Sequence, residues 1–114
     1  MRIEFDFKDQ DVAIMRLQGR FVTGVDIAYL KSKTEELKAT GRHRIIVDFS
    51  EVPYIDSTGL AFIVSAYTTF SKDGGKLVLA RPSARVREVL QLTRLAGIIP
   101  CEDDEAKALV AVRS

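Results

Sequence analysis

Hydroxyl and carboxylate side chains gather in one short segment, Asp56-Ser57-Thr58-Gly59. A serine hydroxyl in such a segment can act as a nucleophile. Asp56 or Ser57 can equally serve as the N-cap of a helix, one of the commonest uses of these residue types. The segment supplies more capping groups than one helix needs. Gly59 falls in the expected first turn, where glycine costs roughly 1 kcal/mol relative to alanine. This glycine indicates that something approaches the backbone closely at this point.

Two enzyme-like chemistries lack the residues they need. A hydrolase with Ser57 as nucleophile needs a base, and the one histidine, His43, lies at the other end of a predicted strand of roughly 20 Å. A phosphate-accepting receiver with Asp48 or Asp56 as acceptor needs an acidic pair after its first strand to hold a metal, and residues 18–20 offer none. We therefore expect no enzymatic activity, no metal and no cofactor.

The composition narrows the class of protein. The chain has 114 residues, 46% of them hydrophobic and 29% charged, and a formal net charge of +1. These values predict one domain over residues 1–114 and exclude both disorder and a strongly basic nucleic-acid binder. The single cysteine, Cys101, excludes an internal disulfide. The N-terminal segment alternates polar and apolar residues, and no apolar stretch reaches ~18 residues, so we expect a cytoplasmic protein without a membrane span.

The apolar pattern predicts strands that alternate with helices. Period-two alternation predicts a hairpin, and a run of β-branched residues predicts a central strand buried on both faces. The predicted strands cover residues 3–7, 12–17, 44–49, 76–80 and 98–101. The predicted helices cover residues 27–37, 57–70, 104–112 and a segment that begins at Pro82 and is closed by Gly97. In the second helix, the predicted apolar stripe is Leu60, Ile63, Val64, Tyr67 and Phe70.

This element order predicts an α/β fold. The expected architecture is a mixed, mainly parallel sheet of about five strands with four helices, in the order βαβαβαβα preceded by an N-terminal strand. Strands connected through helices imply right-handed crossovers and parallel pairing, with the antiparallel hairpin at the start.

The string from Tyr54 to Leu60 resembles the signature of the STAS domain family, specifically of the bacterial anti-sigma factor antagonists. In that family, Asp-Ser-(Ser or Thr)-Gly-Leu opens a helix after a central strand. Residues 45–49 resemble the preceding strand, residues 74–77 the glycine turn into the next strand, and residues 86–97 the third helix and its end. The resemblance covers essentially the whole chain.

The resemblance implies a protein-interaction switch with Ser57 as the phosphoacceptor. It implies that an anti-sigma factor with the histidine-kinase-like ATPase fold is the serine kinase, and that a PP2C-type phosphatase removes the phosphate. The unphosphorylated form then binds the kinase and frees its sigma factor, whereas the phosphorylated form does not bind. The alternative is a STAS scaffold or partner-switch module with another output, such as a stressosome or a secretion system; a phosphorylatable Ser57 disfavours a lipid-transport subunit.

A phosphate at Ser57 is not expected to melt the helix that it begins. The group adds about −1.5 to −2 charges and meets free N–H groups and the positive end of the helix dipole. The expected effect is local: bulk, desolvation and repulsion of carboxylates at a docking face, sharpened by Asp56. The sequence therefore predicts a switch that changes a contact and does not refold the chain.

The loop after the second strand departs from the family pattern. Members often carry Gly-(Glu or Asp)-(Leu or Ile)-Asp there, whereas this chain has Arg20 and Val22 at the two acidic positions. The resemblance implies that this loop lies beside the phosphoacceptor, so the difference bears on partner choice. Phe21 and Val22 form either an exposed apolar contact or a core anchor. We expect a monomer that binds neither nucleic acid nor membrane. The expected partner-binding residues are Asp56, Ser57, Thr58, Gly59, Arg20, Phe21, Val22 and Thr23.

Overall fold

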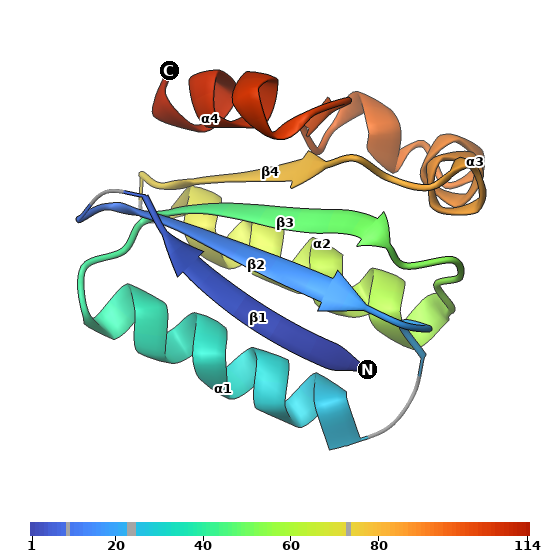
Figure 1. Ribbon diagram of the computed structural model, residues 1–114, viewed down its shortest axis with the longest axis horizontal. Helices are drawn as coiled ribbons and strands as arrows, with labels where there is room; N and C mark the ends of the chain where they lie inside the picture. The colour runs from blue at the N-terminus through green and yellow to red at the C-terminus, as the bar shows by residue number, and fades with distance from the viewer. Residues whose placement is uncertain (9, 23–24, 73) are drawn as a thin grey trace.

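Five strands form one sheet in the order β1-β2-β3-β4-β5 (Figure 1). The computed structural model describes residues 1–8, 10–22, 25–72 and 74–114. β1 pairs antiparallel with β2, and every later neighbour pair is parallel. The predicted mixed, mainly parallel sheet is therefore confirmed, with the central strand third of five. The strands are β1 (Arg2–Phe7), β2 (Val12–Gln18), β3 (Arg44–Glu51), β4 (Lys76–Ala80) and β5 (Cys101–Glu102).

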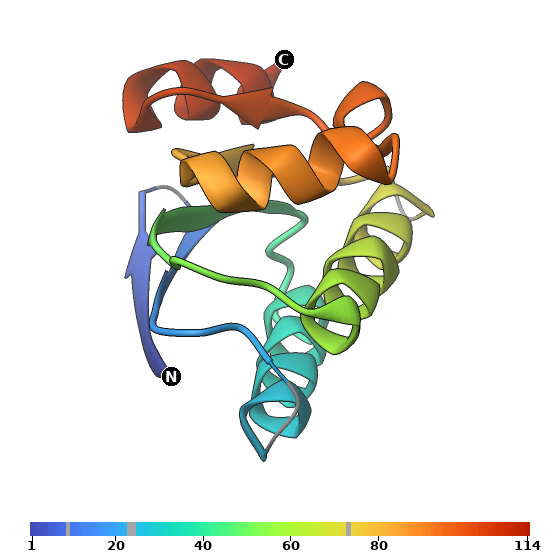
Figure 2. The ribbon, with the colours of Figure 1, turned by 90° about the vertical axis from the view of Figure 1, so that its right-hand side faces the viewer.

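The four predicted helices are also present. They are α1 (Val25–Ala39), α2 (Ser57–Lys72), α3 (Ala84–Leu92) and α4 (Glu105–Arg113), with a 3-10 turn, η1, over Leu95–Gly97. Figure 2 shows α1 and α2 side by side on one side of the sheet, whereas α4 lies on the other side. Within the described ranges, no helix is long and apolar enough to cross a bilayer.

The sheet carries a core on each face because its central strands are apolar on both sides. Ala13 and Val47 belong to the larger cluster, which side chains of α1, α2 and α3 complete. Ile14 and Ile46 belong to a smaller cluster under α4. Each of these four strand residues is fully buried, so both faces of the sheet stabilise the fold through apolar burial.

The helix predicted from Pro82 is shorter than the sequence indicated. Pro82 precedes α3, whose N-cap is Ser83, since the Ser83 hydroxyl accepts a hydrogen bond from Val86 N–H at 3.3 Å. The same hydroxyl donates to Val52 O at 2.9 Å, which fixes the start of α3 on the loop after β3. The helix ends at Leu92, because Arg94 adopts a left-handed conformation with φ of 63°. The strand predicted over residues 98–101 also begins later, because Ile98 caps η1 and the observed strand β5 covers Cys101–Glu102.

The apolar stripe predicted for α2 is rotated around the helix. Val64 is 37% exposed, whereas Phe62 and Ala66, which the prediction omitted, are buried. Two overlapping stripes share Ile63 and Phe70, so helical spacing alone fits both. The observed stripe is the one that brings Gly59 against Phe21, in the loop after β2.

Candidate functional site

The candidate site lies where β2, β3 and β4 end. These strands are parallel, so the loops that follow them meet at one edge of the sheet (Figures 1 and 2). The first loop contains Arg20, Phe21 and Val22, and the second leads through Tyr54 into α2. The structure thus brings together the two segments that the sequence singled out.

Backbone hydrogen bonds join these two loops beyond the ends of their strands. Phe21 and Ile55 form an isolated parallel bridge. The Phe21 N–H donates to Tyr54 O at 2.9 Å, and the Asp56 N–H donates to Phe21 O at 3.1 Å. Phe21 therefore fixes the backbone immediately before α2.

Phe21 is a core anchor. Its side chain is 1% exposed and packs against Phe49 and Phe62, with ring centroids 6.2 and 5.9 Å away. The ring is therefore inaccessible, and the expected role of Phe21 in partner binding stays a prediction. Val22 is half-buried, and the predicted Thr23 lies outside the described residues.

Asp56 is the cap of α2. One carboxylate oxygen accepts hydrogen bonds from Thr58 N–H at 2.9 Å and Gly59 N–H at 3.0 Å, and the backbone carbonyl accepts from Leu60 N–H at 2.9 Å. The sequence left the cap open between Asp56 and Ser57, and the structure assigns it to Asp56. Ser57 is accordingly the first residue of α2, and its side chain is exposed.

Gly59 lies where α2 approaches the first loop most closely. A Cβ at this position would lie 2.5 Å from Phe21 O and 3.0 Å from a carbon of Ile55. The predicted close approach to the Gly59 backbone is therefore confirmed, and the approaching group is this chain's own backbone. Because Gly59 is buried and has no side chain, it shapes the backbone of the site. Its expected role in partner binding stays a prediction.

Thr58 faces a groove between α1 and α2. The groove has a volume of about 290 Å³ and begins beside Ser57. Its lining mixes apolar side chains with two hydroxyls and one lysine, so it offers both packing surface and hydrogen-bonding groups. The lining residues are Ile27, Lys31, Thr58, Ala61, Phe62 and Ser65.

Two arginines contact the ring of Tyr54 on the outer side of the site. The guanidinium carbon of Arg20 lies 5.1 Å from the ring centroid, and that of Arg85, on α3, lies 5.9 Å away. Both distances are in the range of cation–π attraction. From the sequence, Tyr54 is expected to pack in the core or a loop, and Arg85 to belong either to a solvated face of the third helix or to a complement to an acidic partner patch. No local signal links two residues 31 positions apart.

A buried carboxylate lies on the α4 side of the same sheet edge. Asp48 is 3% exposed, forms an ion pair with Arg81, and lies 3.8 Å from Arg16 Nε. Its second oxygen accepts from Ser50 N–H at 2.9 Å. Burial raises the pKa of Asp48, but the hydrogen bonds from Arg81 and Ser50 outweigh burial and leave the pKa below its usual range.

This network joins the sheet to the start of α4. Arg16 pairs with Glu105 and with Asp6, whose carboxylate oxygen lies 3.2 Å from the Arg16 guanidinium. Burial opposes the charge of Arg16, yet the hydrogen bonds to Glu105 and Asp6 raise its pKa overall. Asp48, which the sequence offered as a conceivable phosphoacceptor, is paired with Arg81 and Arg16, and Arg16 in turn pairs with Glu105 of α4.

The remaining reactive side chains lie away from Ser57. His43 is exposed and precedes β3, whereas Ser57 follows β3 and its loop. Eight strand residues span roughly 26 Å, too far for a hydrogen bond between the two. Cys101 is half-buried on β5, and burial raises the pKa of its thiol. Across the ranges that the structure describes, no three histidine, cysteine or acidic side chains are grouped to hold a metal.

A family model supports the resemblance noted in the sequence. The model of the STAS domain matches residues 5–108. A protein of Thermotoga maritima provisionally named an anti-sigma factor antagonist is 30% identical over 111 residues, 96% of this chain and 97% of that protein. The anti-sigma-B factor antagonist of Listeria monocytogenes is 29% identical over 111 residues, 94% of this chain and 95% of that protein.

A solved structure shares the fold. The Bacillus cell fate determinant SpoIIAA in the phosphorylated form superposes with a TM-score of 0.79, over 98% of this chain and 100% of that chain. The two sequences are 19% identical, so this likeness concerns the arrangement of strands and helices.

Proposed function

The chain belongs to the STAS domain family, and on that premise we propose that it is an anti-sigma factor antagonist that works by partner switching. Its unphosphorylated form binds an anti-sigma factor, which thereby releases its sigma factor. The relatives named as anti-sigma factor antagonists align over almost the whole chain, which supports this assignment. The role is regulatory and not enzymatic, and it places the protein in the cytoplasm.

One observation carries the proposal at the level of residues. Asp56 takes the capping role at α2, so the Ser57 hydroxyl is not needed for the helix and stands exposed at its first position. A kinase needs a hydroxyl that its active site can reach. Ser57 is therefore the phosphoacceptor, and the half-buried Thr58 beside it is a first-turn residue.

The location of Ser57 explains how a phosphate acts as a switch. The group adds about −1.5 to −2 charges at a helix N-terminus, where N–H dipoles favour an anion. The helix consequently tolerates the phosphate. A partner docked over this edge meets a new bulky charge next to the Asp56 carboxylate, and loses affinity through desolvation and repulsion.

The partner is a serine kinase of the histidine-kinase-like ATPase fold, and a PP2C-type phosphatase reverses the modification. The contact surface comprises Ser57 and Asp56 at the start of α2, Thr58 in the adjoining groove, and Arg20 and Val22 in the first loop. No cofactor is needed, because the kinase brings the nucleotide.

The test is complex formation with the ATPase-type serine kinases of the source genome. Affinity is measured by calorimetry under conditions in which ATP is not hydrolysed, so that the protein stays unphosphorylated. Wild-type protein and Ser57→Ala are expected to bind one such kinase, and Ser57→Asp is expected to lose at least ~10-fold in affinity. Ser71→Asp is the matched control, because Ser71 is an exposed serine near the other end of α2. Equal affinities for Ser57→Asp and Ser71→Asp would overturn the proposal.

A further inference from the structure

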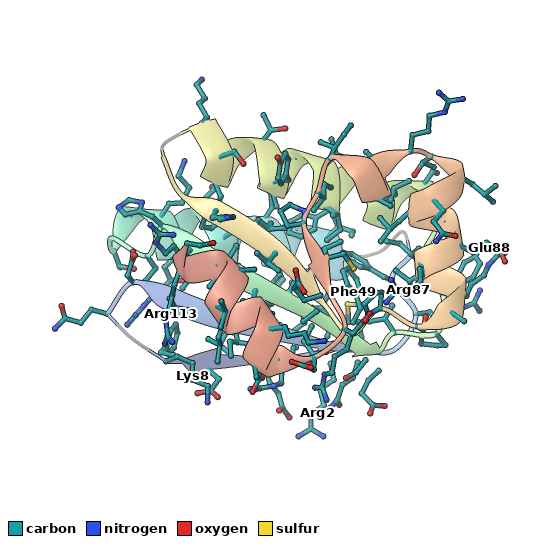
Figure 3. All side chains as sticks on the ribbon, turned by 90° about the horizontal axis from the view of Figure 1, so that it is seen from above. Arg2, Lys8, Phe49, Arg87, Glu88 and Arg113 are labelled. Atoms are coloured by element: carbon teal, nitrogen blue, oxygen red, sulfur yellow. The ribbon has the colours of Figure 1, made fainter. Side chains whose placement is uncertain are left out.

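Tyr54 lies between two exposed arginines that come from different parts of the chain. Arg20 follows β2, Tyr54 follows β3, and Arg85 belongs to α3. Both guanidinium carbons lie within 6 Å of the same ring centroid. Figure 3 shows that α3, which carries Arg87 and Glu88, lies at the opposite end of the molecule from Lys8 and Arg113. Arg20, Tyr54 and Arg85 together form the Arg–Tyr–Arg cluster.

Arg20 differs from most other arginines of the chain because no carboxylate side chain pairs with it in the part of the chain that the structure describes. In the described ranges it forms no ion pair and donates no hydrogen bond, and its guanidinium carbon lies 5.1 Å from the centroid of the Tyr54 ring. A guanidinium that lies over a ring makes no hydrogen bond through this contact, so its N–H donors stay available. The arginines with acidic partners are Arg2, Arg16, Arg44, Arg81, Arg85 and Arg87.

The nearby acidic side chains do not satisfy Arg20. Glu88 pairs with Arg85 at 2.7 Å. The Asp56 carboxylate accepts N–H groups at the start of α2. Glu51 is exposed at the end of β3 and forms no recorded ion pair with Arg20. In the described ranges, the cluster therefore contains one guanidinium without an acidic partner, that of Arg20, and one that is paired with a carboxylate, that of Arg85.

We infer that the Arg–Tyr–Arg cluster receives an acidic segment of the protein that docks at Ser57. The cluster lies close to the start of α2. Tyr54 is three residues before Ser57, and Phe21, which follows Arg20, accepts a hydrogen bond from Asp56 N–H. The identity of the docking protein as the kinase rests on the proposed function. Carboxylates fit an arginine fork bidentately, and the cation–π contact with Tyr54 restrains the Arg20 side chain before the partner arrives.

The cluster also specifies which partners are rejected. Tyrosine and arginine dominate the energetic centres of protein interfaces. A partner surface that places lysine or arginine against Arg20 meets like charge, which costs affinity. The basic Arg20, which stands where the family pattern often has an acid, therefore selects a kinase with the opposite charge on its docking surface.

The first experiment needs no kinase. Protein labelled with ¹⁵N is titrated with a hexaglutamate peptide at low salt, while the arginine Nε–H signals are followed. The Arg20 and Arg85 signals are expected to shift saturably with hexaglutamate, to return in 0.3 M NaCl, and to stay unmoved with hexalysine. Arg94 is the internal reference, because it is exposed and, within the described ranges, has no recorded ion pair. An Arg20 shift no larger than that of Arg94 would overturn the inference.

The second experiment uses the kinase that binds the wild-type protein. Arg20→Glu is expected to slow association at least ~10-fold, and Arg20→Gln to slow it less. Lys72→Glu makes the same charge change at the far end of α2, about 22 Å along the helix, and is expected to leave the rate unchanged. Equal rates for Arg20→Glu and Lys72→Glu would contradict the inference. If no kinase binds the wild-type protein, the proposed function fails, and the peptide titration alone decides the inference.

Discussion

The carbonyl oxygen of Phe21 lies 2.5 Å from the point where a Cβ on Gly59 would stand. The loop after β2 and the first turn of α2 are therefore packed backbone to backbone, without room for a side chain between them. Because the Phe21 ring is also locked between Phe49 and Phe62, the core of the protein fixes the position from which Ser57 is presented.

Gly59→Ala is expected to destabilise the protein by about 1–3 kcal/mol, the usual cost of overpacking. The sign is informative, since alanine in a helix interior is otherwise favoured by roughly 1 kcal/mol. Urea unfolding measures the change. Gly97→Ala serves as the control, because a Cβ there meets nothing within 4 Å; a Gly59→Ala protein as stable as wild type would show that the close approach does not constrain α2.

Asp56→Ala is expected to lower the free energy of unfolding by about 1 kcal/mol, because two N–H groups of α2 lose their acceptor. Asp56→Asn keeps an oxygen that accepts these bonds and is expected to cost much less. The comparison is made by thermal unfolding of the two variants beside wild type. Equal losses for alanine and asparagine would mean that the charge, and not the capping oxygen, matters.

Asp48→Asn is expected to cost about 1–3 kcal/mol at neutral pH, because Arg81 and Arg16 lose a buried charged acceptor. The pKa of Asp48 is lowered in the folded state, so its contribution is complete above the unfolded pKa of about 4 and is lost as pH falls through the folded pKa. Urea unfolding between pH 2.5 and 7 should therefore show the wild-type advantage shrinking below about pH 4. Asp103→Asn, which alters an exposed pair with Arg87, should show little of this dependence; a wild-type advantage constant over the whole range would refute the assignment.

A negative charge at Ser57 is expected to leave the fold intact. Ser57→Asp places an anion at the first position of α2 and should raise the free energy of unfolding by about 0.3–1 kcal/mol. Amide hydrogen exchange of this variant, and of the phosphorylated protein, should retain protection along residues 57–72. Ser71→Asp places the same charge near the opposite end of the dipole and should not stabilise. Broad loss of protection in α2 would mean that the switch works by unfolding.

The element order could be predicted from the sequence because apolar residues recur with a period of two in strands and 3.6 in helices, and these periods are visible within short segments. Residues 45–47 are three consecutive apolar β-formers, which indicates burial on both faces, and they lie in the central strand β3. The rotation of α2 could not be predicted, since the stripes through Val64 and through Phe62 fit the same spacing. The contact between Gly59 and Phe21, 38 residues apart, decides between them.

The candidate site could be predicted only in part from the sequence, because some of its contacts join residues far apart in the chain. The segment Asp56–Gly59 is contiguous, so its chemistry and its resemblance to a family motif could be read directly. The contact of Arg85 with Tyr54 and the pairing of Arg81 with Asp48 arise because β4 and α3 return to the end of β3. Such contacts depend on chain crossovers, and neighbouring residues carry no sign of them.

The central claim is that Ser57 is the residue through which partner binding is switched off. Its most direct test is mass spectrometry of the protein after incubation with the binding kinase and ATP. The expected result is one phosphoryl group, located on Ser57 and absent from Ser57→Ala. A phosphoryl group on Thr58 or another hydroxyl, with Ser57 unmodified, would contradict the account.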